Sequence, residues 1–570
     1  MSGPHGRGAH PERSRRVVPR ALLLAAALLL LDMSVTFENV WPTPRVRWWG
    51  GVSIELAACV VIIAALAWWR GRPLSRLAIA WLSVVWTGLV VGRYADVTAP
   101  ALYGRQINLY WDVRYMPDVA AMITRVTPLW MIIASVAAVS AILWLMWRVI
   151  RWAWSVVGTA LAMPAERRVV AAVAVAVVAF FAVSRIGASS KPWVFQVEEY
   201  KDDNSWLFPA PVTATYAHQI HLAAETFAST GPLAATPAMN SDLSRVHGAD
   251  VFVLFIESYG AVTYTRPEIA GALDASRAQL ASAICDTKRD VVSAYVESPT
   301  YGGSSWLAHI SLLSGVEVRE AGTNARLMIE HRDTLVRAFD REGFRTVALM
   351  PGLRGPWPEG SFYGFDVIYG ADRIAYAGPE FGWFAVPDQF ALHRLDALER
   401  DRASRQPLFV FFPTISPHFP FSPTPPYQPD WRRMSTAQPY DGPDLVGAYA
   451  RQPDWQHFAP DYVNAMAYEF SWMAGYLREH GGDDIVMIVL GDHQPPALVS
   501  GTGASWNVPV HIVASRPELV RRLEASGFRE GLTPAEPAIG RMHALLPLLL
   551  DAFGNRHGSE ANTVRLQPTP

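Results

Sequence analysis

The stretch VFVLFIES, residues 251–258, places six apolar residues directly before a carboxylate and a hydroxyl. A short, continuous apolar run with polar residues after it is typical of a strand buried on both faces of a sheet. Similar runs are Thr346–Met350, Leu408–Phe412 and Ile485–Leu490. Amphipathic helical patterns occur at Thr334–Glu342, Asp388–Arg402 and Tyr462–His480. This alternation predicts an α/β domain with a mostly parallel sheet and helices on both faces.

Side chains that can bind a metal follow three of these predicted strands. Glu257 comes directly after the first strand, and Asp492 and His493 follow strand 485–490 after one glycine. His418 lies shortly after strand 408–412. The carboxyl ends of parallel strands meet at one edge of a sheet, and carboxylates with imidazoles are ligands for zinc, manganese and similar ions. We therefore predict a divalent metal site at this edge. For Asp492 and His493 alone, the alternative is that they only cap a loop.

The segment YGGSSWLAH, residues 301–309, has two hydroxyls after a glycine pair and before an apolar run. This pattern predicts a loop that turns into a helix. A hydroxyl at a helix start lies near free main-chain N–H groups, which favour an anionic group there. A neighbouring metal would lower the pKa of such a hydroxyl and make Ser304 or Ser305 a nucleophile. The alternative is a serine that only caps the helix.

Apolar residues are concentrated in the first third of the chain. Of the 570 residues, 51% are hydrophobic and only 18% are charged. Five segments have about the twenty apolar residues that a membrane span needs, at 17–37, 50–69, 77–95, 128–150 and 169–187. A cleaved signal peptide is the alternative for the first segment, but no convincing cleavage site follows it. The net charge of −2 gives no basic field for binding nucleic acid.

Arginines predict how the chain crosses the membrane. They gather before the first span, between the second and third spans, and between the fourth and fifth, as with Arg15, Arg72 and Arg167. Short basic loops stay in the cytoplasm, so we expect a cytoplasmic N-terminus and, after five spans, a periplasmic or extracellular catalytic domain. The predicted parts are a cytoplasmic tail (1–16), a transmembrane domain of five helices (17–187), a periplasmic connector (188–245), a catalytic domain (246–556) and a C-terminal tail (557–570).

Together these segments resemble the lipoteichoic acid synthases and the phosphoglycerol and phosphoethanolamine transferases, a sulfatase-like branch of the alkaline phosphatase superfamily found in the bacterial inner membrane. The resemblance is carried by the five spans and by Phe255–Tyr259, Gly302–Trp306, Ser416–Phe421 and Gly491–His493. It implies a five-helix transmembrane domain followed by an alkaline phosphatase-like α/β domain. It also implies one divalent ion (Mn, Zn or Mg) held by Glu257, Asp492, His493 and the nucleophile.

The same resemblance bears on the two serines and on His418. In the family the nucleophile stands ten residues before a glycine, which is Gly315 here and favours Ser305 over Ser304. His418 matches a family histidine that contacts the phosphoryl group or a second metal.

Two positions depart from the family pattern. Relatives that handle phosphoglycerol often carry Glu four residues after the nucleophile, where this chain has His309. Lipoteichoic acid synthases carry a Trp-x-Arg that holds a phosphate, where this chain has Trp357 and Glu359. We predict that Trp357, Glu359 and His418 bind substrate, and a carboxylate at 359 suits an ammonium headgroup better than a second phosphate. The segment after Ser305 also lacks the Cys/Ser-x-Pro-x-Arg signature of sulfatases, which argues against sulfate ester hydrolysis.

The resemblance implies a phosphotransferase. A phospholipid would donate phosphoglycerol or phosphoethanolamine to Ser305, and the group would pass to a periplasmic glycan or lipid. Phosphoglycerol is the leading expectation. One alternative is a hydrolase or phosphodiesterase of the same fold acting on a periplasmic ester, with water as the acceptor. Another is a non-enzymatic membrane sensor or assembly factor, which predicts that at least one metal ligand is lost, and none is missing.

Overall fold

The computed structural model describes residues 12–555, apart from 41–42, 49, 104–106, 118–119, 121–123, 125–126, 186–206, 229–231, 356, 358, 383, 403, 452, 455–456 and 502. Residues 1–11 of the predicted N-terminal tail, 188–206 of the connector and the whole C-terminal tail, 557–570, lie outside this description. The chain divides into two compact units, with the main division at residues 229–230.

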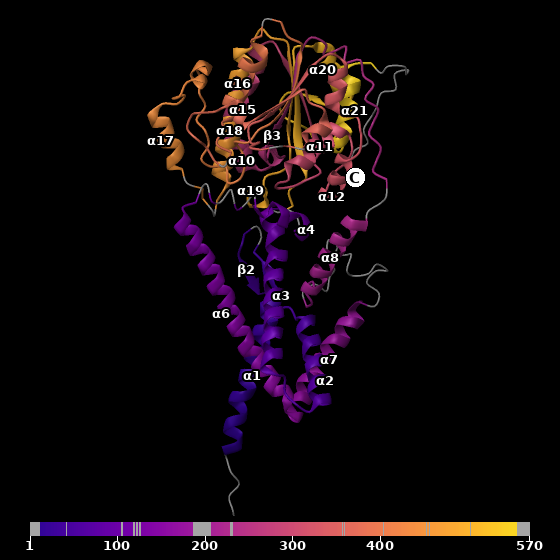
Figure 1. Ribbon diagram of the computed structural model, residues 1–570, viewed down its shortest axis with the longest axis vertical. Coiled ribbons are helices and arrows are strands. Elements are labelled where there is room, and N and C mark those ends of the chain that lie inside the picture. The colour runs from indigo at the N-terminus through magenta and orange to yellow at the C-terminus, as the bar shows by residue number, and fades with distance from the viewer. Residues whose placement is uncertain are drawn as a thin grey trace, which may run out of the picture. The chain divides into compact units, whose positions relative to one another are not determined.

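The first unit is helical. Its elements are α1 (Glu12–Thr36), β1 (Phe37–Asn39), β2 (Val46–Trp48), α2 (Ile54–Arg70), α3 (Arg76–Tyr103), α4 (Leu109–Asp112), η1 (Val113–Tyr115), α6 (Leu129–Ala162), α7 (Pro164–Arg185) and α8 (Val212–Ala228) (Figure 1). α1 packs against α6, and α2 packs against α7. In the core of this bundle the rings of Trp86 and Trp154 meet edge to face, with 5.2 Å between their centroids.

Three helices of this unit are long and apolar enough to cross a membrane: Arg76–Tyr103, Leu129–Ala162 and Pro164–Ser184. Side chains of α6 are exposed as lipid contact would require, with Ile133 at 60% and Val136 at 62%. The first two predicted spans, 17–37 and 50–69, fall on α1 and α2. α2 has 17 residues, about 25 Å of helix against a hydrocarbon core of about 30 Å. Three of the five predicted spans are therefore supported, and the full set of five stays a prediction.

The predicted loop between the fourth and fifth spans is not a loop. α6 runs to Ala162 and α7 begins at Pro164, so the two helices are joined at Met163. Proline is favoured in the first turn of a helix because its missing N–H has no partner there, which explains why the new helix starts at this residue. The apolar segment found at 128–150 is thus the first part of a longer helix, and residues 169–185 of the last segment lie inside α7.

The second unit contains an eight-stranded sheet with the strand order β10-β4-β9-β8-β3-β7-β5-β6. The strands are β3 (Asp250–Ile256), β4 (Asp290–Glu297), β5 (Arg345–Met350), β6 (Val367–Gly370), β7 (Leu408–Pro413), β8 (Ile485–Gly491), β9 (Asn507–Ala514) and β10 (Arg529–Glu530). Neighbours from β8 to β6 are parallel, while β9 runs antiparallel to β8 and β4, and β10 runs antiparallel to β4. The prediction of a mostly parallel α/β sheet is confirmed.

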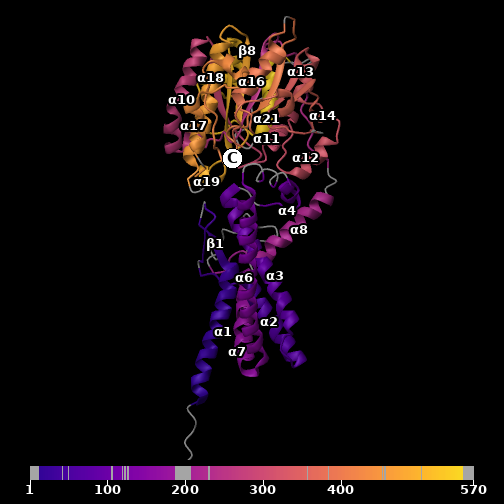
Figure 2. The same ribbon diagram turned by 60° about the vertical axis from the view of Figure 1, so that its left-hand side comes forward.

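Helices cover both faces of this sheet (Figures 1 and 2). α11 (Ser305–Ser314), α13 (Leu335–Arg341), α20 (Pro517–Ala525) and α21 (Met542–Phe553) share a core with Val251, Val253 and Phe255 of β3. α10 (Pro267–Asp286), α16 (Asp388–Leu395) and α18 (Ala459–Glu479) share the other core with Phe252, Leu254 and Ile256. β3 is therefore buried on both faces, which explains its unbroken apolar run.

Shorter elements complete the unit. They are α9 (Val262–Thr265), α12 (Ala321–Met328), α14 (Gly360–Tyr363), α15 (Ala371–Ile374), η3 (Asp396–Arg400, a π-helical turn), η4 (Trp431–Ser435), α17 (Gly442–Ala450) and α19 (Ala497–Ser500).

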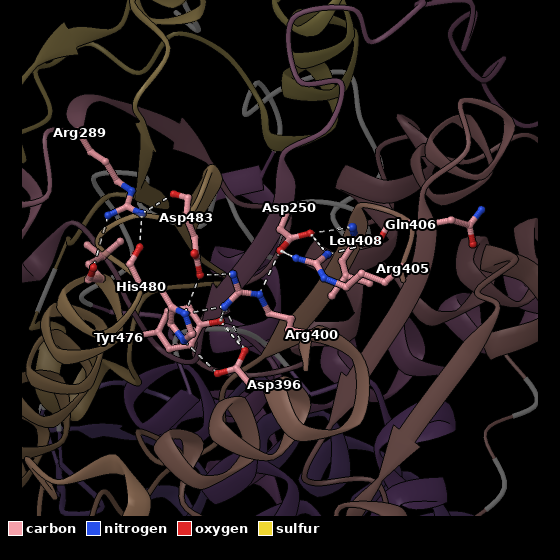
Figure 3. Close-up of polar contacts among 11 residues, drawn as sticks. Asp250, Arg289, Asp396, Arg400, Arg405, Gln406, Leu408, Tyr476, His480 and Asp483 are labelled. Carbon is pink, nitrogen blue, oxygen red and sulfur yellow. Dashed lines mark hydrogen bonds and ion pairs between the residues drawn. The ribbon is translucent and has the colours of Figure 1, made fainter. Parts of the chain in front are cut away.

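A partly buried ionic network lies at the sheet edge at which β3 and β7 begin (Figure 3). The Arg400 guanidinium contacts Asp250 at 3.0 Å, Asp396 at 3.3 Å and Asp483 at 2.6 Å. Arg405 binds both oxygens of Asp250, at 2.6 and 2.8 Å. Asp250 also accepts the Leu408 N–H at 3.0 Å, which ties the starts of the two strands together. The polar groups at the opposite edge, where these strands end, are therefore the candidates for function.

Candidate metal centre

Glu257 and Asp492 lie side by side because of strand register. β3 and β8 are parallel neighbours, and Ile256 pairs with Gly491, so the next residue of each strand is a carboxylate. Ser258 turns the chain away from the sheet with a φ of 59°, in the left-handed region. Its N–H donates to Asp492 Oδ1 at 2.8 Å, and its hydroxyl donates to Glu257 Oε1 at 3.0 Å. The sharp turn after β3 therefore holds both carboxylates in place.

His493 completes the group. Its Nδ1 lies 2.8 Å from the main-chain oxygen of Gln494, so Nδ1 carries the proton and donates to that carbonyl. Nε2 is then free to bind a metal, and it lies 3.5 Å from Glu257 Oε1 and 3.6 Å from Asp492 Oδ2. In metal-binding histidines, a hydrogen bond from the ring nitrogen that does not bind the metal fixes the orientation of the ring.

Ser305 is the first residue of α11, and its hydroxyl joins the three ligands. Oγ donates to Glu257 Oε2 at 3.0 Å and lies 3.2 Å from His493 Nε2. Ser304 precedes the helix with a φ of 63°, and its side chain makes no capping hydrogen bond. Of the two serines, Ser305 is the one that the fold brings to Glu257 and His493.

Electrostatics indicate that this group is built for a cation. Glu257, Asp492 and His493 are buried and offer ligand atoms that all lie within 4.8 Å of one another. Burial, and then the adjacent charge of Glu257, raise the pKa of Asp492 well above its usual value. Burial would also raise the pKa of Glu257, but His493 and His418 outweigh it and lower that pKa. Two adjacent buried carboxylates, one imidazole and one hydroxyl fit a divalent ion, whose charge would relieve their repulsion.

His418 lies near these residues on the loop after β7. Its Nδ1 is 2.8 Å from the main-chain oxygen of Phe419, and its ring meets the edge of Phe384 with 5.0 Å between centroids. With Phe384, Ile415 and Ser416 it lines a small cavity of about 20 Å³. His418 is near enough to Glu257 and His493 to affect the pKa of each.

The other predicted substrate-binding residues do not contact this group in the structure. Trp357 packs against Tyr363, with 5.5 Å between ring centroids, and Glu359 is exposed at the start of α14. The His309 ring lies against Phe255 and Phe411, with 4.6 and 5.3 Å between ring centroids. Burial lowers the pKa of His309 to about 3, so it is a neutral ring and not a replacement for a family carboxylate.

Two supporting residues were not predicted from the sequence. Thr414 Oγ1 accepts the Glu257 N–H at 3.1 Å, and the Ser298 hydroxyl donates to the main-chain oxygen of Asp492 at 2.5 Å. Each follows the end of a strand, β7 or β4, by one residue. Polar residues directly after buried strands were the signal that could have identified Thr414.

Comparison with known proteins finds a family model that is similar to part of this domain. Residues 298–509 match the family model described as Sulfatase. No protein in the curated set matches the chain.

Solved structures with a similar fold include a protein in the alkaline phosphatase superfamily from Vibrio parahaemolyticus, 16% identical, covering 58% of this chain and 73% of that one (TM-score 0.36). Others are a lipoteichoic acid synthase from Listeria monocytogenes (13% identical, 51% and 70% covered, TM-score 0.34) and the C-terminal periplasmic domain of a phosphoethanolamine transferase from Campylobacter jejuni (12% identical, 54% and 90% covered, TM-score 0.34). The family match extends from Ser298 through α11 and the His418 loop to the Asp492–His493 pair. Residues 298–509 of this chain are therefore similar to the Sulfatase family.

Proposed function

We propose that this protein is a membrane-anchored phosphotransferase that moves a phosphoglycerol or phosphoethanolamine group from a phospholipid to a periplasmic glycan or lipid. The observation that carries the proposal is the position of the Ser305 hydroxyl, 3.0 Å from Glu257 Oε2 and 3.2 Å from His493 Nε2. A hydroxyl at a helix start within a set of metal ligands is the arrangement of an activated nucleophile. Helices long enough to cross a membrane favour a lipid as the donor.

A divalent ion (Mn, Zn or Mg) held by Glu257, Asp492, His493 and Ser305 would lower the pKa of the hydroxyl and neutralise charge on the phosphoryl oxygens. The chain's own residues supply the rest of the reaction. Ser305 Oγ attacks the phosphorus, and its proton passes to the Glu257 carboxylate to which it already donates. The phosphorus–oxygen bond to diacylglycerol breaks, and His418 in its protonated form gives a proton to the departing oxygen.

The second half of the reaction returns the enzyme to its starting state. A hydroxyl of the acceptor attacks the phosphorus on Ser305 and gives its proton to His418. The bond between phosphorus and Ser305 Oγ breaks, and Glu257 returns the proton to the serine. Dividing the transfer in this way replaces one difficult displacement with two easier ones.

Hydrolysis of a periplasmic ester is the second candidate function, favoured by the match to the Sulfatase family model over residues 298–509. The first half of the reaction is then the same, and water replaces the acceptor. Only the fate of the transferred group distinguishes the two candidates.

The test uses the purified full-length protein, a divalent ion and vesicles of phosphatidylglycerol or phosphatidylethanolamine. Wild type is expected to release diacylglycerol. Ser305→Ala is expected to lose at least about a thousandfold in rate, because the nucleophile is gone. Ser304→Ala is the matched control and is expected to retain activity. Equal release by wild type and Ser305→Ala would refute the proposal, and free glycerol phosphate in place of a modified acceptor would favour hydrolysis.

A further inference from the structure

Asp388, at the start of α16, is a fully buried carboxylate that binds the main chain of the His418 loop. Its Oδ2 accepts the N–H of Ser416 at 2.7 Å, and Oδ1 accepts the N–H of Ile415 at 3.0 Å. Burial raises the pKa of Asp388 to about 6, although the N–H groups of Ser416 and Ile415 oppose that shift. The carboxylate is therefore ionised at neutral pH and fixes the segment that donates to it.

The segment held in this way is the turn that presents His418. The His418 N–H donates to the main-chain oxygen of Ile415 at 3.1 Å, which closes the turn. The imidazole Nδ1 then donates to the Phe419 oxygen at 2.8 Å, so Nε2 is the nitrogen left for a substrate. The position of Nε2 therefore depends on a turn in which the N–H groups of Ile415 and Ser416 both donate to the Asp388 carboxylate.

A second carboxyl group lies beside Asp388. Glu469 of α18 is 0% exposed, and neither of its oxygens has a hydrogen-bond partner of normal geometry among the described residues. Asp388, Thr414 and Trp472 are still near enough to affect its pKa, which burial, and then the charge of Asp388, raise well above the usual value. An unpartnered carboxyl in this position is neutral, because a second buried negative charge next to Asp388 would be strongly unfavourable.

We propose that Asp388 positions His418 by holding the Ile415–His418 turn. Asp388 touches neither the metal ligands nor the substrate, so it is a positioning residue. The part of this inference that concerns turnover rests on the proposed phosphotransfer. The part that concerns the turn does not.

Isosteric substitution of each carboxyl group gives a matched pair of variants. In Asp388→Asn an amide NH₂ replaces one acceptor oxygen, and the turn loses a charge-assisted hydrogen bond. Glu469→Gln changes a neighbouring buried carboxyl group that makes no hydrogen bond to the turn among the described residues. The two changes are alike in size and burial, so a merely structural role would make them equivalent.

The first measurement is the rate at which diethyl pyrocarbonate modifies His418 in the full-length protein, followed by mass spectrometry. His457, with 75% of its side chain exposed, is the internal standard. Asp388→Asn is expected to raise the His418 rate roughly threefold or more, an effect within reach of losing one charge-assisted hydrogen bond. Glu469→Gln is expected to leave it within about twofold of wild type on the same grounds. A His418 rate that is unchanged or lowered in Asp388→Asn, or raised equally in both variants, overturns the inference. If Asp388→Asn does not fold, Asp388→Glu, which keeps the charge but displaces the oxygens, replaces it with the same expectation.

The second measurement is a double-mutant cycle on diacylglycerol release. Asp388→Asn is expected to lower kcat roughly tenfold to a hundredfold, with KM within about twofold, as misplacement of a catalytic group does. In a His418→Ala background the same change is expected to cost less than about twofold, because its effect passes through His418. Equal losses in both backgrounds overturn the inference. Absence of lipid turnover in wild type would refute the proposed function, and the His418 modification rates would still test the role of Asp388 in holding the turn.

Discussion

At the scale of single residues, the geometry of the candidate metal centre depends on hydrogen bonds between side chains and main chain. Ser258 N–H and His493 N–H both donate to Asp492 Oδ1, at 2.8 and 2.6 Å. The positions of Glu257, Asp492 and His493 could be predicted because these residues directly follow two strands whose apolar runs are visible in the sequence. The position of Asp388 could not be predicted, because its partners, Ile415 and Ser416, lie on a separate segment and its own sequence pattern is that of an ordinary helix.

The metal ligands give the first prediction. Asp492→Ala is expected to lower metal affinity by more than the roughly 10–100-fold that loss of an outer partner of a ligand causes, and to abolish lipid turnover. Metal content is measured by elemental analysis of the purified protein, with Glu359→Gln as the control for loss of a carboxylate outside the centre. Full metal content in Asp492→Ala would count heavily against this site.

Glu359 gives the second prediction. It is exposed at the start of α14, where a carboxylate favours an ammonium headgroup by an exposed ion pair. Glu359→Gln is therefore expected to lower the ratio of phosphatidylethanolamine to phosphatidylglycerol turnover by up to about fivefold, the effect of about 1 kcal/mol. The measurement is competition between the two lipids in mixed vesicles. An unchanged ratio means that Glu359 does not read the headgroup.

At the scale of elements, the strands with unbroken apolar runs were the predictable ones. The predicted strand at 251–256 is extended by one residue in β3, and that at 485–490 by one residue in β8. β4 and β9 were not predicted, because polar residues interrupt their apolar pattern. Two of these polar residues, Ser293 of β4 and His511 of β9, are register partners, and the Ser293 hydroxyl lies 2.6 Å from His511 Nδ1. A cross-strand polar pair of this kind is invisible until the register is known.

His511 gives the third prediction, a pH dependence of stability. Burial lowers the pKa of His511 to about 3, against about 6.5 in the unfolded chain. Between these two pKa values, His511 is protonated in the unfolded state and neutral in the folded state. Its contribution to the stability of the folded state is therefore complete above about pH 6.5 and falls as the pH drops towards 3. Between pH 7 and 5 this group accounts for a loss of about 2 kcal/mol in the free energy of unfolding.

His511→Gln keeps a hydrogen-bonding side chain and removes the titration. Urea unfolding of the two proteins at several pH values is expected to show a shallower acid slope for the variant. Parallel slopes for wild type and His511→Gln would show that His511 takes up its proton equally in both states.

At the scale of the whole molecule, the number of membrane spans decides on which side of the membrane the second unit is expected to lie. The arginine pattern, with Arg15, Arg72 and Arg167 in three separate regions, was read together with five spans, and three helices are long and apolar enough to cross. Five and three are both odd numbers of spans. With either number, a chain that begins on one side of the membrane ends on the other side. Composition alone could not fix the lengths, because α6 continues well beyond the apolar segment that identifies it.

The fourth prediction is the topology that follows. An alkaline phosphatase reporter fused to the C-terminus is expected to be active, since it folds only outside the cytoplasm, and a green fluorescent reporter at the same place to stay dark. Fusions at the N-terminus are expected to give the reverse result. A fluorescent C-terminal fusion would place the metal centre in the cytoplasm and remove access to a periplasmic acceptor.

The central claim is that Ser305 carries the transferred group. The full-length protein is incubated with phosphatidylglycerol and phosphatidylethanolamine vesicles and a divalent ion, without acceptor, and its peptides are analysed by mass spectrometry. The account predicts a glycerophosphoryl or phosphoethanolamine group on Ser305, absent from Ser305→Ala and still present on Ser305 in Ser304→Ala. Lipid turnover with the group on Ser304, or with no modified serine, would contradict it.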